Sequence, residues 1–216
     1  MLRFLKSHPS AVLLAAQLLS VLAFPFMEDT TTARALFSAV GILVLSLALL
    51  SVSRSPLWLA PGLALAVPAV VLLVVEVFTD SPDLVPWTEL LLTAVYLYAA
   101  AGLIVYMLAD RHVTRDELFA VGATFTLVAW AFAHLYTWCQ VVYPGSFTAA
   151  LDPDAPRTWT ELLFLSFTTL SGTGLSDIVP IHPFARALVM LEQVAGVGYI
   201  VMVVSRLVTL LPGHRL

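Results

Sequence analysis

One segment between two long apolar stretches carries polar and small residues where a membrane-crossing helix would carry leucine and valine. The segment, residues 164–180, reads Phe-Leu-Ser-Phe-Thr-Thr-Leu-Ser-Gly-Thr-Gly-Leu-Ser-Asp-Ile-Val-Pro. Irregular backbone at membrane depth is tolerated only where it is buried in protein or lines a water-filled path. Rings of backbone carbonyls at such a place can replace the hydration shell of a cation. The segment therefore predicts a short helix, a polar turn and a re-entrant return to the surface.

The two glycines in the centre of this segment, Gly172 and Gly174, suit such a turn. Pointing successive carbonyls toward one axis places alternating residues in left-handed dihedrals, which glycine adopts at the lowest cost. A helix that ends at the turn also presents partial negative charge from its last carbonyls to a cation. We therefore expect the turn to hold cations.

The composition of the whole chain agrees with a membrane location. Of 216 residues, 60% are hydrophobic and only 11% are charged, against about 25% charged in an ordinary soluble domain. The lipid bilayer is therefore the expected surrounding of most of the surface. The net charge of −4 comes with no basic patch, so no nucleic-acid partner is expected.

Six apolar stretches are each close to or above the ~20 residues that a helix needs to cross a bilayer. They cover residues 10–27, 33–53, 57–79, 86–109, 115–143 and 183–211. Capping boxes at Thr114–Glu117 and Thr158–Glu161 predict the starts of the fifth span and of the short helix before the turn. The predicted fold class is an all-α membrane protein with six transmembrane helices and a re-entrant pore helix and filter between the fifth and sixth.

The positions of the basic residues predict the orientation. With both termini in the cytoplasm, seven of the 10 Lys and Arg residues lie on or near the inner side, and only Arg34, Arg157 and Arg186 lie outside. This distribution follows the positive-inside rule. We therefore predict a protein of the plasma (inner) membrane with both termini cytoplasmic.

Two short motifs within the polar segment match a known family. They are Ser166-Phe-Thr-Thr-Leu170 before the turn and Asp177-Ile-Val-Pro180 after it. With them, residues 115–212 resemble the pore module of the potassium-channel superfamily, whose pattern S-F-T-T-L-T-T-V-G-Y-G-D-I-V-P aligns here without a gap. Gly196 then falls at the hinge glycine of the inner helix. The resemblance implies a homotetramer, because four pore loops surround one axis.

The centre of the motif departs from that family. The signature T-V-G-Y-G is replaced by Gly172-Thr-Gly-Leu-Ser176, so the second glycine is Ser176, the tyrosine is Leu175 and the innermost threonine is Gly172. The segment Thr173–Ser176 is also similar to the single-glycine filter segments of the Trk/Ktr potassium-uptake proteins. A second register places Gly172-Thr-Gly174 over G-Y-G. These departures predict K⁺ permeation with reduced selectivity.

The resemblance assigns roles to twelve residues. Ion binding in the filter is expected at Ser171, Gly172, Thr173, Gly174, Leu175 and Ser176, filter support and the outer mouth at Thr168, Thr169 and Asp177, and a cavity or gating role at Glu192, Gly196 and Gly198.

Two of these assignments have alternatives. Glu192 either lines the inner cavity or forms hydrogen bonds behind the pore helix, and Gly196 and Gly198 either permit bending or allow close helix packing.

The chain divides into two predicted domains. Residues 1–113 form a four-helix region whose fourth span, Trp87 to Met107, contains no Lys or Arg, although voltage sensing requires several such charges. Residues 114–216 form the pore domain.

These patterns predict a cation channel for passive transport, with a monovalent cation, K⁺ first, as the permeant ion. We expect no cofactor, no metal beyond permeant cations and no enzymatic activity. One alternative is a nonconducting channel-like subunit with a structural or regulatory role. A secondary transporter is the other, although such folds usually contain paired broken helices and only one interrupted segment occurs here.

Overall fold

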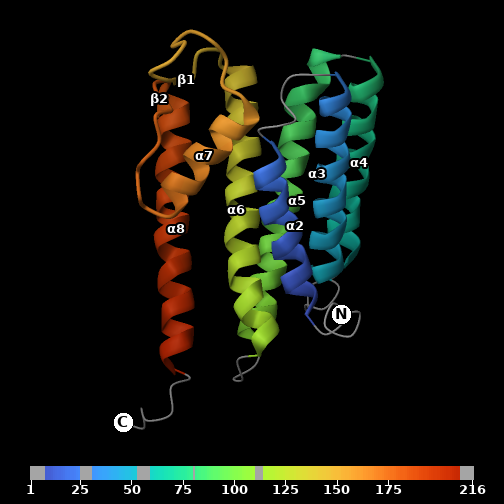
Figure 1. Ribbon diagram of the computed structural model, residues 1–216, viewed down its shortest axis with the longest axis vertical. Coiled ribbons are helices and arrows are strands. Elements are labelled where there is room, and N and C mark those ends of the chain that lie inside the picture. The colour runs from blue at the N-terminus through green and yellow to red at the C-terminus, as the bar shows by residue number, and fades with distance from the viewer. Residues whose placement is uncertain (1–7, 25–30, 53–58, 80, 110–113, 210–216) are drawn as a thin grey trace.

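Long apolar helices that alternate in direction make up most of the chain in the computed structural model (Figure 1), which describes residues 8–24, 31–52, 59–79, 81–109 and 114–209. In chain order the elements are α2 (Pro9–Ala23), α3 (Thr31–Val52), α4 (Leu59–Thr79), η2 (Pro82–Leu84), α5 (Val85–Leu108), α6 (Arg115–Val142), β1 (Phe147–Thr148), α7 (Trp159–Leu170), β2 (Val179–Pro180) and α8 (Pro183–Thr209).

The predicted all-α class is confirmed, and four helices among the described residues are long and apolar enough to cross a membrane. Their spans are Leu59–Glu76, Pro82–Leu108, Arg115–Val142 and Pro183–Arg206. Helix α2 has only 15 residues and is shorter than the predicted span 10–27. In α3 the apolar stretch of described residues, Ala39–Ala48, is also too short to be counted as a membrane span. Pro25 follows the end of α2 closely, and proline cannot continue a helix without losing a hydrogen bond.

Both predicted capping boxes are present. The backbone N–H of Glu117 donates to the Thr114 hydroxyl at 3.3 Å, and the Glu117 carboxylate accepts from the Thr114 backbone N–H at 3.3 Å. The same exchange joins Thr158 and Glu161, at 3.2 and 2.7 Å. These side chains satisfy N–H groups that the first turn of a helix leaves without partners, so α6 and α7 begin where the sequence predicts.

Helices α5 and α6 pack together more extensively than any other pair of described elements. The Thr93 hydroxyl lies 3.4 Å from the Ala131 carbonyl across this contact. Small buried residues allow helix backbones to approach closely in a membrane protein. On these two helices they are Ala99, Ala100, Gly102, Ala120, Ala123, Ala129, Ala131 and Ala133.

Helix α7 is tilted between α6 and α8, and the chain turns back after it toward the end of the molecule at which β1 and β2 pair (Figure 1). Helix α8 stands at the edge of the molecule, on the opposite side from α4. Much of α8 is exposed in the single chain, including Met190, Leu191, Val194, Val197, Val201 and Val204. The polar segment of the sequence thus lies beside an apolar helix face that no other described part of the chain covers.

Candidate pore site

The short helix α7 ends against the middle of α8. Gly196 is the middle residue of the 27 in α8, and a Cβ atom placed there would lie 2.1 Å from the Leu170 carbonyl oxygen. No side chain fits at that separation, so glycine is required for this contact. The polar turn therefore begins at half the length of the neighbouring apolar helix.

Glu192 of α8 makes a second contact with α7, about one helical turn before Leu170. Its carboxylate is 0% exposed and accepts hydrogen bonds from the hydroxyls of Ser166 on α7 and Tyr136 on α6. The Ser166 hydroxyl also lies 2.8 Å from the Ala129 carbonyl. A buried acid is costly unless it is hydrogen-bonded, and these donors supply that compensation. In the single chain Glu192 is therefore hydrogen-bonded to α6 and α7.

The turn starts with a helix cap. Ser171 is the C-cap of α7, and the next residue, Gly172, has φ +72°. The Gly172 N–H donates to the Thr169 carbonyl at 3.1 Å. A left-handed glycine with this bond is typical of the Schellman-type end of a helix. Gly172 therefore terminates α7.

Gly174 is the second left-handed residue of the turn, with φ +67°. Its N–H donates to the Thr168 carbonyl at 3.1 Å. The Ser171 and Thr173 hydroxyls are each 3.3 Å from the same carbonyl and 3.0 Å from each other. The turn therefore folds over the last carbonyls of α7, while the side chains of Thr168 and Thr169 are buried at its base.

The chain straightens after Gly174. The φ angles of Leu175 and Ser176 are not positive. Leu175 is 78% exposed, and the Ser176 hydroxyl accepts from the backbone N–H of Ile178 at 3.0 Å. The exposed Asp177 follows at the surface. The alternation of left-handed residues thus stops after Gly174, because Ser176, at the position of the second glycine of the family pattern, is not left-handed.

A clamp holds the loop that leads into α7. The buried Arg157 side chain donates to the carbonyls of Leu151, Asp152 and Ala155 and to the Glu161 carboxylate, at 2.5–3.3 Å. Gln140 on α6 accepts from the Arg157 N–H at 2.7 Å and donates to its carbonyl at 2.9 Å. The start of α7 is thereby tied to the end of α6.

A family model described as ion channel matches residues 93–212, which is more than half of the chain. The chain belongs to this ion channel family. No curated protein and no solved structure matches it. The matched part of the channel starts in α5, before the predicted domain boundary at residue 114, and includes α6, α7, the turn and α8.

The channel structure brings ten of the twelve predicted site residues close to the end of α7. Thr168, Thr169 and Ser171–Ser176 form the end of α7 and the turn, and Glu192 and Gly196 contact α7 from α8. Asp177 follows this segment and is exposed. Gly198 stands apart, since nothing within 4 Å would meet a Cβ atom at this position.

Tyr136 is a site residue that the sequence did not reveal. It lies on α6, is 0% exposed and donates to Glu192 of the channel. Its signal in the sequence is indirect: an acid in the middle of an apolar helix needs hydroxyl or N–H donors. Several hydroxyl residues of α6 could supply one, and only the packing of α6 against α8 selects Tyr136.

Proposed function

We propose that four copies of this chain form a channel for monovalent cations, with K⁺ as the main permeant ion and weak discrimination against Na⁺. The observation that carries the proposal is the contact between Leu170 and Gly196, because it sets the polar turn at half the length of α8. Irregular backbone at such a depth needs burial in protein or a water-filled path. A path at the axis of a tetramer satisfies this requirement.

The exposed surface of the chain supports the tetramer. Leu175 in the turn and Val194 on α8 are 78% and 72% exposed. In an oligomer with the turn at the axis, copies of α8 cover each other's apolar faces, and a ring closes when the rotation between copies is a quarter turn. The channel then has six spans per chain, with α2 and α3 as the first two, and residues 1–113 surround the pore domain of residues 114–216.

We assign the filter to Ser171–Ser176 in the ungapped register. The left-handed φ of Gly172 is accounted for by the end of α7, which leaves Gly174 as the first filter glycine. Backbone carbonyls and the Ser171 and Thr173 hydroxyls then replace water around the cation. Thr168 and Thr169 support the turn, and Asp177 at the outer mouth raises the local concentration of cations.

Weak selectivity follows from the outer half of the filter. Ser176 does not adopt the left-handed conformation of a glycine, and Leu175 has no hydroxyl with which to donate to the pore helix. With fewer ordered carbonyl rings, the filter discriminates less strongly between ions of different radius. Glu192 holds the pore helix in place, Gly196 allows its close approach to α8, and Gly198 is a position at which α8 can bend during gating.

The orientation that we propose places the β1–β2 end outside and both termini in the cytoplasm of a cell with this chain in its plasma membrane. The positive-inside distribution of basic residues supports it. An ion pair between Arg206 on α8 and Glu117 on α6, 2.9 Å apart, then lies near the inner surface, where it joins the two helices of the pore domain.

A nonconducting subunit is the second candidate, and one observation favours it. The Thr168 carbonyl lies within 3.1–3.3 Å of three donors from the turn itself. A carbonyl engaged in this way is less available to an ion. In this reading the turn is a structural cap, and the chain serves as a scaffold or regulatory partner.

Flux into liposomes separates the two candidates. We expect the purified tetramer to pass K⁺, and Gly174→Ala to reduce the flux strongly because a Cβ at φ +67° is strained. Gly41→Ala in α3 is the matched control, since nothing within 4 Å would meet its Cβ. Folded tetramers that pass neither K⁺ nor Na⁺ contradict the channel proposal and favour the nonconducting subunit.

A further inference from the structure

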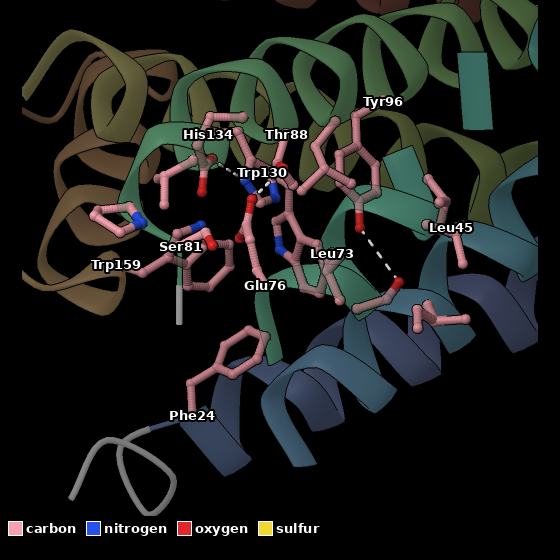
Figure 2. A pocket seen from close by; sticks show the side chains of 17 residues that line it. Phe24, Leu45, Leu73, Glu76, Ser81, Thr88, Tyr96, Trp130, His134 and Trp159 are labelled. Atoms are coloured by element: carbon pink, nitrogen blue, oxygen red, sulfur yellow. Dashed lines mark hydrogen bonds and ion pairs between the residues drawn. The ribbon is translucent and has the colours of Figure 1, made fainter. Parts of the chain in front are cut away.

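A cavity lies away from the turn, between α6 and the helices before the pore domain (Figure 2). Its volume is about 400 Å³. It is lined by residues of α3, α4, α5, α6 and η2, by Phe24 after α2, by Ser81 before η2 and by the first residue of α7. The exposed Pro82 and the half-buried Ser81 line it beside η2, so the cavity reaches the surface there. Its volume lies within the range of small-molecule sites, about 300–1,000 Å³.

Two carboxylates face this cavity from different helices. Glu76 on α4 accepts from the Thr88 hydroxyl, and Glu89 on α5 lies 2.6 Å from Nδ1 of His134 on α6. Figure 2 shows Glu76, Thr88 and His134 together in the middle of the view. None of the described residues that line the cavity is a lysine or arginine. The described lining therefore contains two acidic side chains and, apart from His134, no basic one.

Four aromatic side chains line the cavity: Phe24, Tyr96, Trp130 and Trp159. The centroid of the Trp130 ring lies 5.5 Å from the ring centroids of Trp159 and Phe24 and 5.7 Å from that of Tyr96. Aromatic faces attract cations, with the strongest effect where water is excluded. These aromatic side chains therefore favour a cation with an apolar body over a small hydrated ion.

Trp130 forms part of the wall of the cavity. Its side chain is 1% exposed, and its Nε1 atom is buried without a hydrogen-bond partner among the described residues. A molecule in the cavity would therefore pack against the indole ring and would not reach this donor.

We propose that this cavity binds a small organic ammonium ion that carries an aromatic body. The ammonium group pairs with Glu76 and Glu89, and the body packs against the aromatic rings. A resident metal fits less well, because the described residues contain no group of three or more His, Cys, Asp and Glu side chains placed to hold one. The site does not depend on conduction through the turn.

Three matched probes test the proposal on the full-length protein in lipid nanodiscs, with binding followed by saturation-transfer NMR. The first, 2-phenoxyethylamine, has the ammonium group, the aromatic ring and an ether oxygen. In 2-phenoxyethanol a neutral hydroxyl replaces the ammonium group, and in 3-phenylpropylamine a methylene replaces the ether oxygen. We expect 2-phenoxyethylamine to bind at least about tenfold more tightly than the neutral analogue, as a charge-assisted hydrogen bond would give.

Substitutions of residues that line the cavity test whether the probe binds there. Glu76→Gln and Glu89→Gln should each weaken binding of 2-phenoxyethylamine by about tenfold. The wild type should bind 3-phenylpropylamine about as tightly as 2-phenoxyethylamine, because both keep the ammonium group and the aromatic ring. Asp154→Asn is the control, because it removes a negative charge from an exposed loop residue outside the cavity. Empty nanodiscs correct for partition into lipid.

Three results overturn the proposal: no binding above empty nanodiscs, equal binding of the amine and its neutral analogue, or equal loss in Asp154→Asn and the cavity variants. Because the comparison between probes uses wild-type protein, it holds even where a variant does not fold. Binding in a protein that passes no ions would support this site while contradicting the proposed channel function.

Discussion

Individual residues decide how closely α7 approaches α8. Gly196 allows the contact with Leu170, and Glu192 supplies the hydrogen bonds that hold Ser166 and Tyr136. The sequence predicted both positions as important, because an acid and a glycine four residues apart share one helix face. It left open whether Glu192 faces a cavity or α7, since the rotation of α8 about its axis depends on packing that no local pattern contains.

A substitution at Gly196 tests this contact. Gly196→Ala places a methyl group where the Leu170 carbonyl lies 2.1 Å away, so α7 must move. We expect a loss of about 1–3 kcal/mol of stability, the usual cost of overpacking, seen as a lower melting temperature of the detergent-solubilised protein.

Gly198→Ala is the matched control on the same helix. Nothing within 4 Å would meet its Cβ, and alanine favours a helix over glycine by up to ~1 kcal/mol. Equal melting temperatures for the two alanine variants would contradict the close contact between Gly196 and Leu170.

At the scale of elements, local signals predicted the helices well. The capping boxes at Thr114 and Thr158 start α6 and α7 as predicted, because both partners of each box lie within one turn. The end of α2 at Ala23 was predicted too late, since apolar composition continues to Met27 while Pro25 interrupts the helix pattern. The predicted start of the third span at residue 57 lies outside the described residues.

The clamp between α6 and α7 could not be predicted, because Gln140 and Arg157 are far enough apart in sequence that only the fold brings them together. We expect Arg157→Met to loosen residues 149–157, since it removes the side-chain hydrogen bonds to the carbonyls of this loop. Hydrogen exchange of the loop amides should become faster.

Arg186→Met is the control for the clamp. The exposed Arg186 side chain donates to the Pro180 carbonyl at 3.1 Å, so its removal affects another part of the structure. If exchange in residues 149–157 is unchanged by Arg157→Met, or is increased equally by both variants, the clamp does not order this loop.

For the whole molecule, the chain is a member of the ion channel family with apolar membrane helices, as the composition and the polar segment predicted. The assembly is a different matter. A single chain reveals only which surfaces are left uncovered, so the tetramer is a proposal that rests on the resemblance of the pore motif and on the exposed face of α8.

That face provides a test of assembly. Val194 on α8 is 72% exposed and Val71 on α4 is 53% exposed in the single chain. Tryptophan is tolerated on a lipid-facing surface but overfills a packed interface. We expect Val194→Trp to reduce the tetramer fraction in cross-linking and mass measurements, and Val71→Trp to leave it unchanged. A tetramer that is insensitive to Val194→Trp would show that this face of α8 contacts lipid.

The reversal potential under K⁺/Na⁺ bi-ionic conditions, recorded from the purified protein in planar bilayers, tests the account most directly. We predict that the wild type passes both cations with a modest preference for K⁺, because the left-handed alternation ends at Gly174. The double variant Leu175→Tyr/Ser176→Gly should shift the reversal potential toward higher K⁺ selectivity. No cation current from folded wild-type tetramers, or identical selectivity in the double variant, would contradict the assignment of Ser171–Ser176 as the filter.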